Sequence, residues 1–92
     1  DNNTLNNLVL SSTNLNPGHS TSGHKHKGQE EVYIFVKGSG EMMLTSPDNS
    51  EKKFSVTTGD IVLVEDGVHH KVFNTGKEEL YFVCVFDGKR SH

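Results

Sequence analysis

The sequence contains no alanine and no tryptophan, and it has only two prolines among its 92 residues. Alanine is the strongest helix former, and no stretch of the chain repeats apolar residues at the 3.6-residue helical period. Short runs of β-branched and aromatic residues are present instead, and Gly, Asn, Asp and Pro separate them. This pattern is typical of an all-β sandwich or barrel and speaks against a helical fold.

Cysteine is equally scarce, because Cys84 is the only one. No disulfide can form within the chain, which favours a reducing compartment and predicts a cytoplasmic protein. No run approaches the ~18 apolar residues of a membrane-spanning helix, so we expect no membrane partner. The chain starts at Asp1 without a methionine, which leaves open whether residues before it were removed.

The charge balance argues against a nucleic-acid partner. Nine Lys and Arg against twelve Asp and Glu give a net charge of −3, with a pI near 6.0. This balance gives no electrostatic reason to bind a nucleic acid, so no nucleic-acid partner is expected. Only 32% of the residues are hydrophobic, which is little for a small core. A bound metal or a partner subunit would therefore add useful stability.

The chain length predicts a single domain over residues 1–92, with a polar start at 1–7 that we expect to be frayed. Seven or eight antiparallel strands are expected, because no connection is long enough for a crossover helix. The candidate strands are an edge strand at 8–10 and the runs 31–36, 41–45, 53–57, 61–64, 69–73 and 80–86. The run 61–64 is apolar at every position, as a strand covered on both faces would be. Asn74 is expected to cap a turn through its side chain.

Three histidines and one glutamate could meet as metal ligands. His24 and His26 are two residues apart, so on a strand both side chains leave from the same face. Glu31 opens the next apolar run, and His70 lies on a strand of the other half of the chain. Such a set would hold one divalent transition metal (Mn, Fe, Ni, Zn, Co or Cu) and leave two octahedral positions open. Considered separately, two histidines at this spacing on a strand are more often a surface pair than a pair of ligands, and a lone glutamate is usually solvated.

Glycines around these residues complete two motifs, Gly18-x5-His24-x-His26-x4-Glu31-x6-Gly38 and Gly59-x5-Glu65-x-Gly67-x2-His70-x3-Asn74. They resemble the two motifs of the cupin superfamily, with motif one at 18–38 and motif two at 59–74. The one departure is Glu65, which stands where the family usually has a proline that shapes a turn and binds no metal. The resemblance implies a cupin double-stranded β-helix, a jelly-roll β-barrel. It also implies one metal ion bound by His24, His26, Glu31 and His70.

Two neighbouring residues compete for these ligand positions. Glu30 precedes Glu31, but the six-residue gap to the closing glycine selects Glu31, and strand parity turns Glu30 to the other face. His69 is expected to face away from His70 for the same reason.

Alternation along the strands also predicts what surrounds the metal. If Glu31 points inward, Tyr33 and Phe35 point inward as well, and Val72 follows His70. By resemblance to small cupins, the face of 80–86 that carries Phe82 and Cys84 is also expected to point inward. The substrate pocket is thus predicted to be lined by Phe35, Val72, Phe82 and Cys84, with Tyr33 as the one candidate proton donor and catalytic residue. Plain core packing is the alternative for all of these side chains.

The resemblance leaves two functions open. One is a metalloenzyme of the dioxygenase, isomerase or lyase (decarboxylase) type that acts on a small oxygen-rich molecule, since an open metal position can bind such a ligand. The other is a non-catalytic module that binds or senses a metal or a small ligand. A homodimer is expected in either case, partly by resemblance and partly because the apolar edge strand at 8–10 needs a partner.

Overall fold

The computed structural model describes residues 8–21 and 30–87, which form strands, turns and loops. Seven strands follow one another along the chain: β1 (Leu8–Leu15), β2 (Glu31–Lys37), β3 (Ser39–Thr45), β4 (Glu51–Thr57), β5 (Ile61–Val64), β6 (His69–Phe73) and β7 (Leu80–Asp87). The predicted strands are confirmed, and the largest difference is β1, which continues to Leu15. Within these described ranges, no helix has the length and apolar character needed to cross a membrane.

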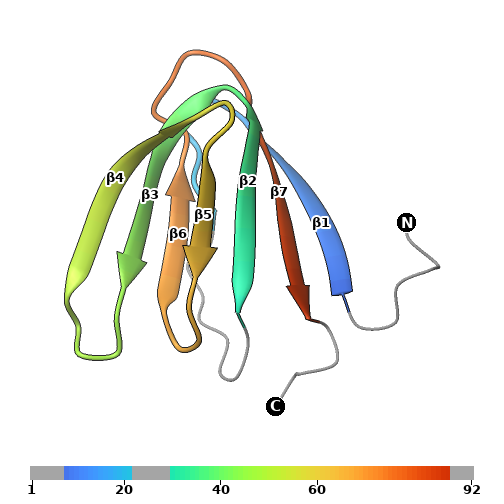
Figure 1. Cartoon of the computed structure of the whole chain (residues 1–92). Helices are drawn as coiled ribbons and strands as arrows, with labels where there is room; N and C mark the ends of the chain where they lie inside the picture. Colours follow the sequence, from blue (N-terminus) through green and yellow to red (C-terminus); the bar gives the residue numbers. More distant parts are fainter. Residues whose placement is uncertain (1–7, 22–29, 88–92) are drawn as a thin grey trace.

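The strands form two antiparallel sheets that face each other (Figure 1). One sheet has the strand order β1-β7-β2-β5, and the other has the order β4-β3-β6. Strands that are distant in the chain, such as β2 and β7, are therefore direct neighbours. This arrangement is the all-β jelly roll that the sequence predicted.

At the connection between β2 and β3, the chain passes from one sheet to the other through a single glycine. Gly38 lies between β2 and β3 with a φ of 96°, a backbone conformation that glycine adopts without steric cost. A Cβ atom at this position would lie 2.6 Å from the carbonyl oxygen of Glu79. The glycine that closes motif one is therefore needed for the fold, because it lets β2 and β3 join different sheets.

Alternate residues of each strand fill the space between the sheets. On β2, Tyr33 and Phe35 are buried, while the residues between them are more exposed. The rings of Tyr33, Phe35 and Phe82 pack together, with centroids 5.4–6.4 Å apart. Val72 and Cys84 are buried in the same core, so the predicted inward directions are confirmed.

Asn74 acts as the predicted turn cap. Its Nδ2 atom donates hydrogen bonds to the carbonyl oxygens of Leu15 and Glu78, each at 2.8 Å. Its Oδ1 atom accepts a hydrogen bond from the backbone N–H of Gly76 at 2.9 Å. One buried side chain thus joins the end of β1 to the loop between β6 and β7.

The prediction that β5 is covered on both faces is wrong. Ile61 is 63% exposed and Leu63 is 68% exposed, whereas Val64 between the sheets is buried. β5 is the edge strand of the four-stranded sheet. In a two-sheet sandwich only the inner face of each sheet is covered, so half of this apolar strand faces outward.

Candidate metal centre

Two of the predicted metal ligands come together between the sheets. Glu31 opens β2 in the four-stranded sheet, and His70 lies on β6 in the three-stranded sheet. Both side chains are buried, with exposed fractions of 4% for Glu31 and 2% for His70. The Oε1 atom of Glu31 lies 3.3 Å from the Nε2 atom of His70. The two motifs therefore converge on one point in the interior.

The other ring nitrogen of His70 is held by the backbone. Its Nδ1 atom lies 3.3 Å from the carbonyl oxygen of Val68, and a carbonyl oxygen can only accept a hydrogen bond. In the tautomer that has its hydrogen on Nδ1, this contact is a hydrogen bond and the Nε2 lone pair is directed toward Glu31. An imidazole lone pair and a carboxylate oxygen at this separation require a proton or a cation between them. Both are ligand types for a divalent transition metal, so the pair fits such an ion.

The rival residues lie where strand parity predicted. Glu30 is exposed, and His69 is only partly buried on the opposite side of β6 from His70. His24 and His26 lie outside the described residues, and their part in the ligand set stays a prediction. In residues 8–21 and 30–87, no three His, Cys, Asp or Glu side chains gather as a metal-binding group. This part of the chain thus supplies two of the four predicted ligands.

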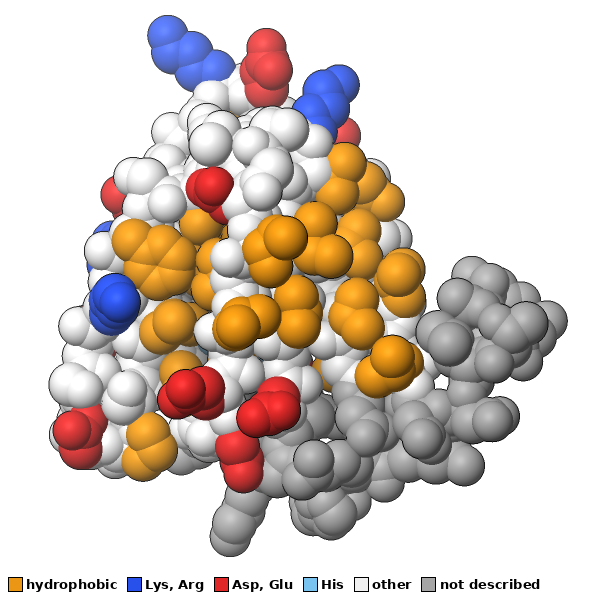
Figure 2. Space-filling model, in the orientation of Figure 1, with side chains coloured by type: hydrophobic (Ala, Val, Ile, Leu, Met, Phe, Trp, Pro, Cys, Tyr) orange, Lys and Arg blue, Asp and Glu red, His pale blue; other side chains and the backbone are white. Residues whose placement is uncertain are grey.

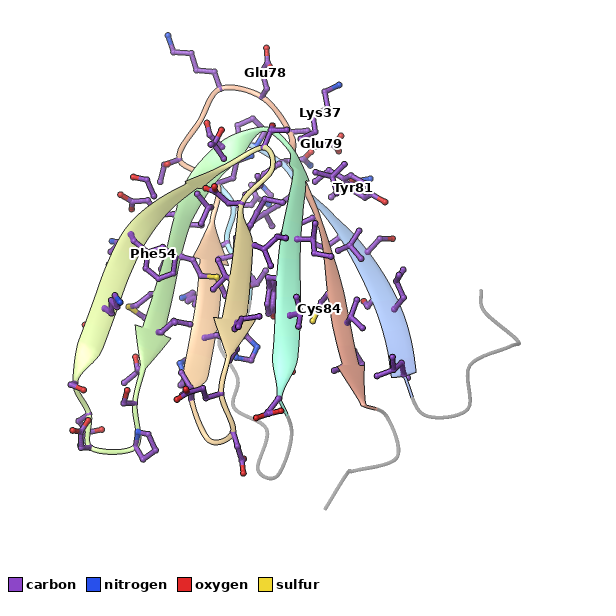
Figure 3. All side chains as sticks on the ribbon, in the orientation of Figure 1. Lys37, Phe54, Glu78, Glu79, Tyr81 and Cys84 are labelled. Atoms are coloured by element: carbon purple, nitrogen blue, oxygen red, sulfur yellow. The ribbon has the colours of Figure 1, made fainter. Side chains whose placement is uncertain are left out.

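Two polar side chains border the Glu31–His70 pair. The thiol of Cys84, on β7 (Figure 3), donates a hydrogen bond to Oε1 of Glu31, with a Sγ–Oε1 distance of 3.3 Å. Burial, together with the nearby charge of Glu31, raises the pKa of Cys84 to about 12. The ring of Tyr33 meets the ring of His70 edge-on at 5.4 Å. Burial, helped by Cys84 and Glu31, raises the pKa of Tyr33 far above its usual value. Both groups are therefore neutral near pH 7, so they can donate hydrogen bonds but hold their protons tightly.

A cavity of about 480 Å³ opens beside Glu31. Its apolar wall includes Leu44, Val64 and Val68, and its charged lining residues are Glu30, Glu51, Lys52 and Glu65 in addition to Glu31. The residues of this apolar wall were not predicted from the sequence. Val64 stands opposite Glu31 because β5 pairs with β2, and a local sequence pattern does not contain that pairing.

The side chains predicted to line a substrate pocket lie elsewhere in the interior. Phe35, Val72, Phe82 and Cys84 belong to the buried core and are not among the residues that line this cavity. Their contact with a substrate, and the catalytic role of Tyr33, stay predictions.

The sequence profile of the Cupin domain family matches residues 11–86. The chain therefore belongs to the cupin family, as the two glycine-framed motifs predicted.

Its relatives in sequence carry two kinds of name. A glucose-6-phosphate isomerase from Pyrococcus abyssi is 32% identical over 74 residues, which cover 78% of this chain and 39% of that protein. An oxalate-binding protein from Thermotoga maritima is 35% identical over 71 residues, which cover 77% of this chain and 54% of that protein. The chain thus spans only about two fifths to one half of the length of these relatives.

Solved structures share the fold. A predicted oxalate decarboxylase from Thermotoga maritima superposes with a TM-score of 0.75 at 28% identity, covering 86% of this chain and 64% of that chain. An oxalate oxidase superposes with a TM-score of 0.84 at 23% identity, covering 92% of this chain and 44% of that chain. At that lower identity the likeness concerns the fold alone.

Proposed function

We propose that this cupin binds one divalent transition metal through His24, His26, Glu31 and His70. We further propose that it is a metalloenzyme acting on a small, oxygen-rich molecule. The observation that carries the proposal is the buried Glu31–His70 pair, with Oε1 and Nε2 3.3 Å apart. A carboxylate and an imidazole as deeply buried as these would be costly to keep without a proton or cation between them. A bound metal meets that need and uses the ligand set that the motifs predict.

The surroundings of the pair suit chemistry on a ligand oxygen. When bound, the metal would act as a Lewis acid or redox centre toward such an oxygen. Cys84 holds the carboxylate of Glu31 through its thiol hydrogen. Leu44, Val64 and Val68 give the adjoining cavity an apolar wall beside its charged lining residues. Tyr33, whose ring lies edge-on to that of His70, is the proposed proton donor on its position alone, because its raised pKa makes the hydroxyl a weak acid.

The names of the relatives support two of the three reaction types. Isomerase chemistry is supported by the glucose-6-phosphate isomerases, and decarboxylase chemistry by the predicted oxalate decarboxylase. The dioxygenase type stays within the proposal as a prediction from the motifs. The substrate is a small molecule, and we expect the protein to be cytoplasmic and homodimeric.

A non-catalytic binding module is the second candidate. It is favoured by one observation, the 35% identity to a protein named for binding oxalate. Such a module would use the same metal to anchor a ligand, and it would release that ligand unchanged.

Metal content measured by elemental analysis tests the proposal. His70→Ala removes one predicted ligand, whereas His69→Ala changes the adjacent histidine, which faces away from the site. We expect one metal ion per chain in the wild type and in His69→Ala, and almost none in His70→Ala. Equal metal content in all three proteins would reject the assignment.

Turnover assays on the metal-loaded protein then separate the two candidates. Oxalate, sugar phosphates, enediols and diketones are the compounds to test, with O₂ uptake and product formation as the two readouts. Product formation with any of them supports the enzyme. Tight binding of one of them without any product supports the binding module.

A further inference from the structure

Lys52 starts from the same face of the three-stranded sheet as the predicted metal ligand His70. It lies on β4 directly opposite Leu44 of β3, and Leu44 lies directly opposite His70 of β6. Residues opposite each other on neighbouring strands share one face of the sheet. Because the side chain of His70 is buried between the sheets, Lys52 also belongs to the inner face.

The burial of the other residues of β4 agrees with this direction. Phe54 and Val56 follow Lys52 at the two-residue period of a strand. Val56 is buried, and Phe54 packs against the core. Lys53 belongs to the opposite face, where its Nζ atom lies 3.6 Å from Oε1 of Glu41. The two adjacent lysines therefore have different surroundings, and only Lys52 is directed toward the candidate site.

A single cavity connects Lys52 with Glu31. Both residues line the cavity of about 480 Å³, and apolar side chains form the wall beside them. His70 and Lys52 are two strand spacings apart across the sheet, which puts their Cα atoms about 10 Å apart. The lysine ammonium is carried on a flexible four-carbon stem. It can therefore contact a group of the substrate that lies several bonds away from the metal.

The other charged residues around the cavity are carboxylates, and Figure 2 shows acidic side chains gathered at this end of the molecule. Glu30 and Glu51 directly precede Glu31 and Lys52, so strand parity turns their side chains to the outer faces. Glu65 is exposed just beyond the end of β5. Lys52 is thus the only cation in the described part of the cavity lining.

No carboxylate of the described residues neutralises Lys52. The ion pairs between these residues join Lys53 to Glu41 and His70 to Glu31. Lys52 is therefore available to a ligand, and an ammonium beside an apolar wall attracts an anion more strongly than one in open water.

We propose that Lys52 determines specificity by binding an anionic group, a carboxylate or a phosphate, at the end of the substrate remote from the metal. This inference rests on the proposed function, because the metal would hold the other end of the substrate. It selects molecules that have oxygen ligands at one end and an anionic group several bonds away. Oxalate is too short to contact both, since its two carboxylates are adjacent.

Titration calorimetry of the Mn²⁺-loaded protein with three hydroxamates tests the proposal. The three compounds share the metal-binding hydroxamate and a chain of three methylene groups, and the chain ends in a methyl, a carboxylate or a phosphonate group. We expect at least one of the two anionic compounds to bind the wild type about tenfold more tightly than the methyl compound. The tighter of the two identifies the anionic group. If neither binds more tightly than the methyl compound, the proposal is wrong.

Substitutions at the two adjacent lysines test whether Lys52 causes this preference. Lys52→Met keeps an unbranched side chain but removes the charge, so we expect the preference to disappear while the affinity for the methyl compound is unchanged. Lys52→Arg keeps the charge and should retain most of the preference. The matched control, Lys53→Met, removes a charge from the opposite face of the same strand and should retain all of it. A preference that survives Lys52→Met, or that is lost equally in Lys53→Met, would overturn the proposal.

The methyl compound separates a failure of this proposal from a failure of the metal centre. Because Lys52 is exposed, its substitution should leave the Tm nearly unchanged, and folded variants are expected. If the methyl compound binds and the anionic compounds bind no better, only the role of Lys52 is rejected. If none of the three compounds binds the wild type, the proposed metal function fails, and the role of Lys52 fails with it.

Discussion

The thiol of Cys84 donates a hydrogen bond to the carboxylate of Glu31, with Sγ and Oε1 3.3 Å apart in the interior. The same oxygen lies 3.3 Å from Nε2 of His70. Cys84 thus orients a predicted metal ligand through a hydrogen bond, as residues outside the coordination shell do in other metal sites. The hydrogen bond to Glu31 thus gives the only cysteine of the chain a structural role.

Removal of this thiol hydrogen is expected to weaken metal binding. Cys84→Val keeps an apolar side chain, somewhat larger than that of cysteine, but has no donor, so Glu31 loses the group that orients it. We expect Mn²⁺ affinity, measured by titration calorimetry, to fall by about 10-fold or more. Cys84→Ser keeps a donor and should stay much closer to the wild type. If Cys84→Val binds as tightly as the wild type, the orienting role is wrong.

The same thiol predicts a pH dependence for the metal-free protein. The pKa of Cys84 is raised from its usual 9.0 to about 12 in the folded state, so the folded chain holds this proton more tightly than the unfolded chain does. The neutral thiol therefore contributes stability below about pH 9, and that contribution is lost as the pH rises toward 12. We expect the Tm in EDTA to fall more steeply above pH 9 for the wild type than for Cys84→Ser. Parallel curves would refute this.

Asn74 is expected to matter for stability rather than for metal binding. Asn74→Ala leaves the carbonyl oxygens of Leu15 and Glu78 without the donor that now satisfies them. Lost hydrogen bonds of this kind cost about 1–3 kcal/mol each, so thermal denaturation should show a Tm lower by roughly 10 °C or more. Thr75→Ala, at the exposed neighbouring position, should shift the Tm very little. A similar Tm for both variants would contradict the account.

The local sequence pattern was sufficient for the positions of the strands and for the side-chain directions on β2. Runs of β-branched and aromatic residues between turn residues located the strands, and alternation turned Tyr33 and Phe35 inward. Spacing and parity selected Glu31 over Glu30, and the burial of Glu31 agrees with that choice. These results follow from the strict two-residue period of a strand, which any register preserves.

Features that depend on strand order could not be predicted from the local sequence pattern. β5 was expected to be covered on both faces, because an all-apolar run looks the same in a central strand and at an edge. Its edge position beside β2 places Val64 opposite Glu31 in the cavity wall and leaves Ile61 outside. The contact between Cys84 and Glu31 likewise requires that β7 pair with β2. Long-range pairing decides these features, and no local pattern specifies it.

Metal binding by two matched glutamine variants tests the central claim most directly. Glu31→Gln removes the buried carboxylate beside His70, whereas Glu30→Gln changes its exposed neighbour. Titration of metal-free protein with Mn²⁺ should give one site per chain for the wild type and for Glu30→Gln. Glu31→Gln should bind at least about 100-fold more weakly, because a charged oxygen ligand has been lost. Wild-type affinity in Glu31→Gln, or the same loss in Glu30→Gln, would contradict the proposed metal centre.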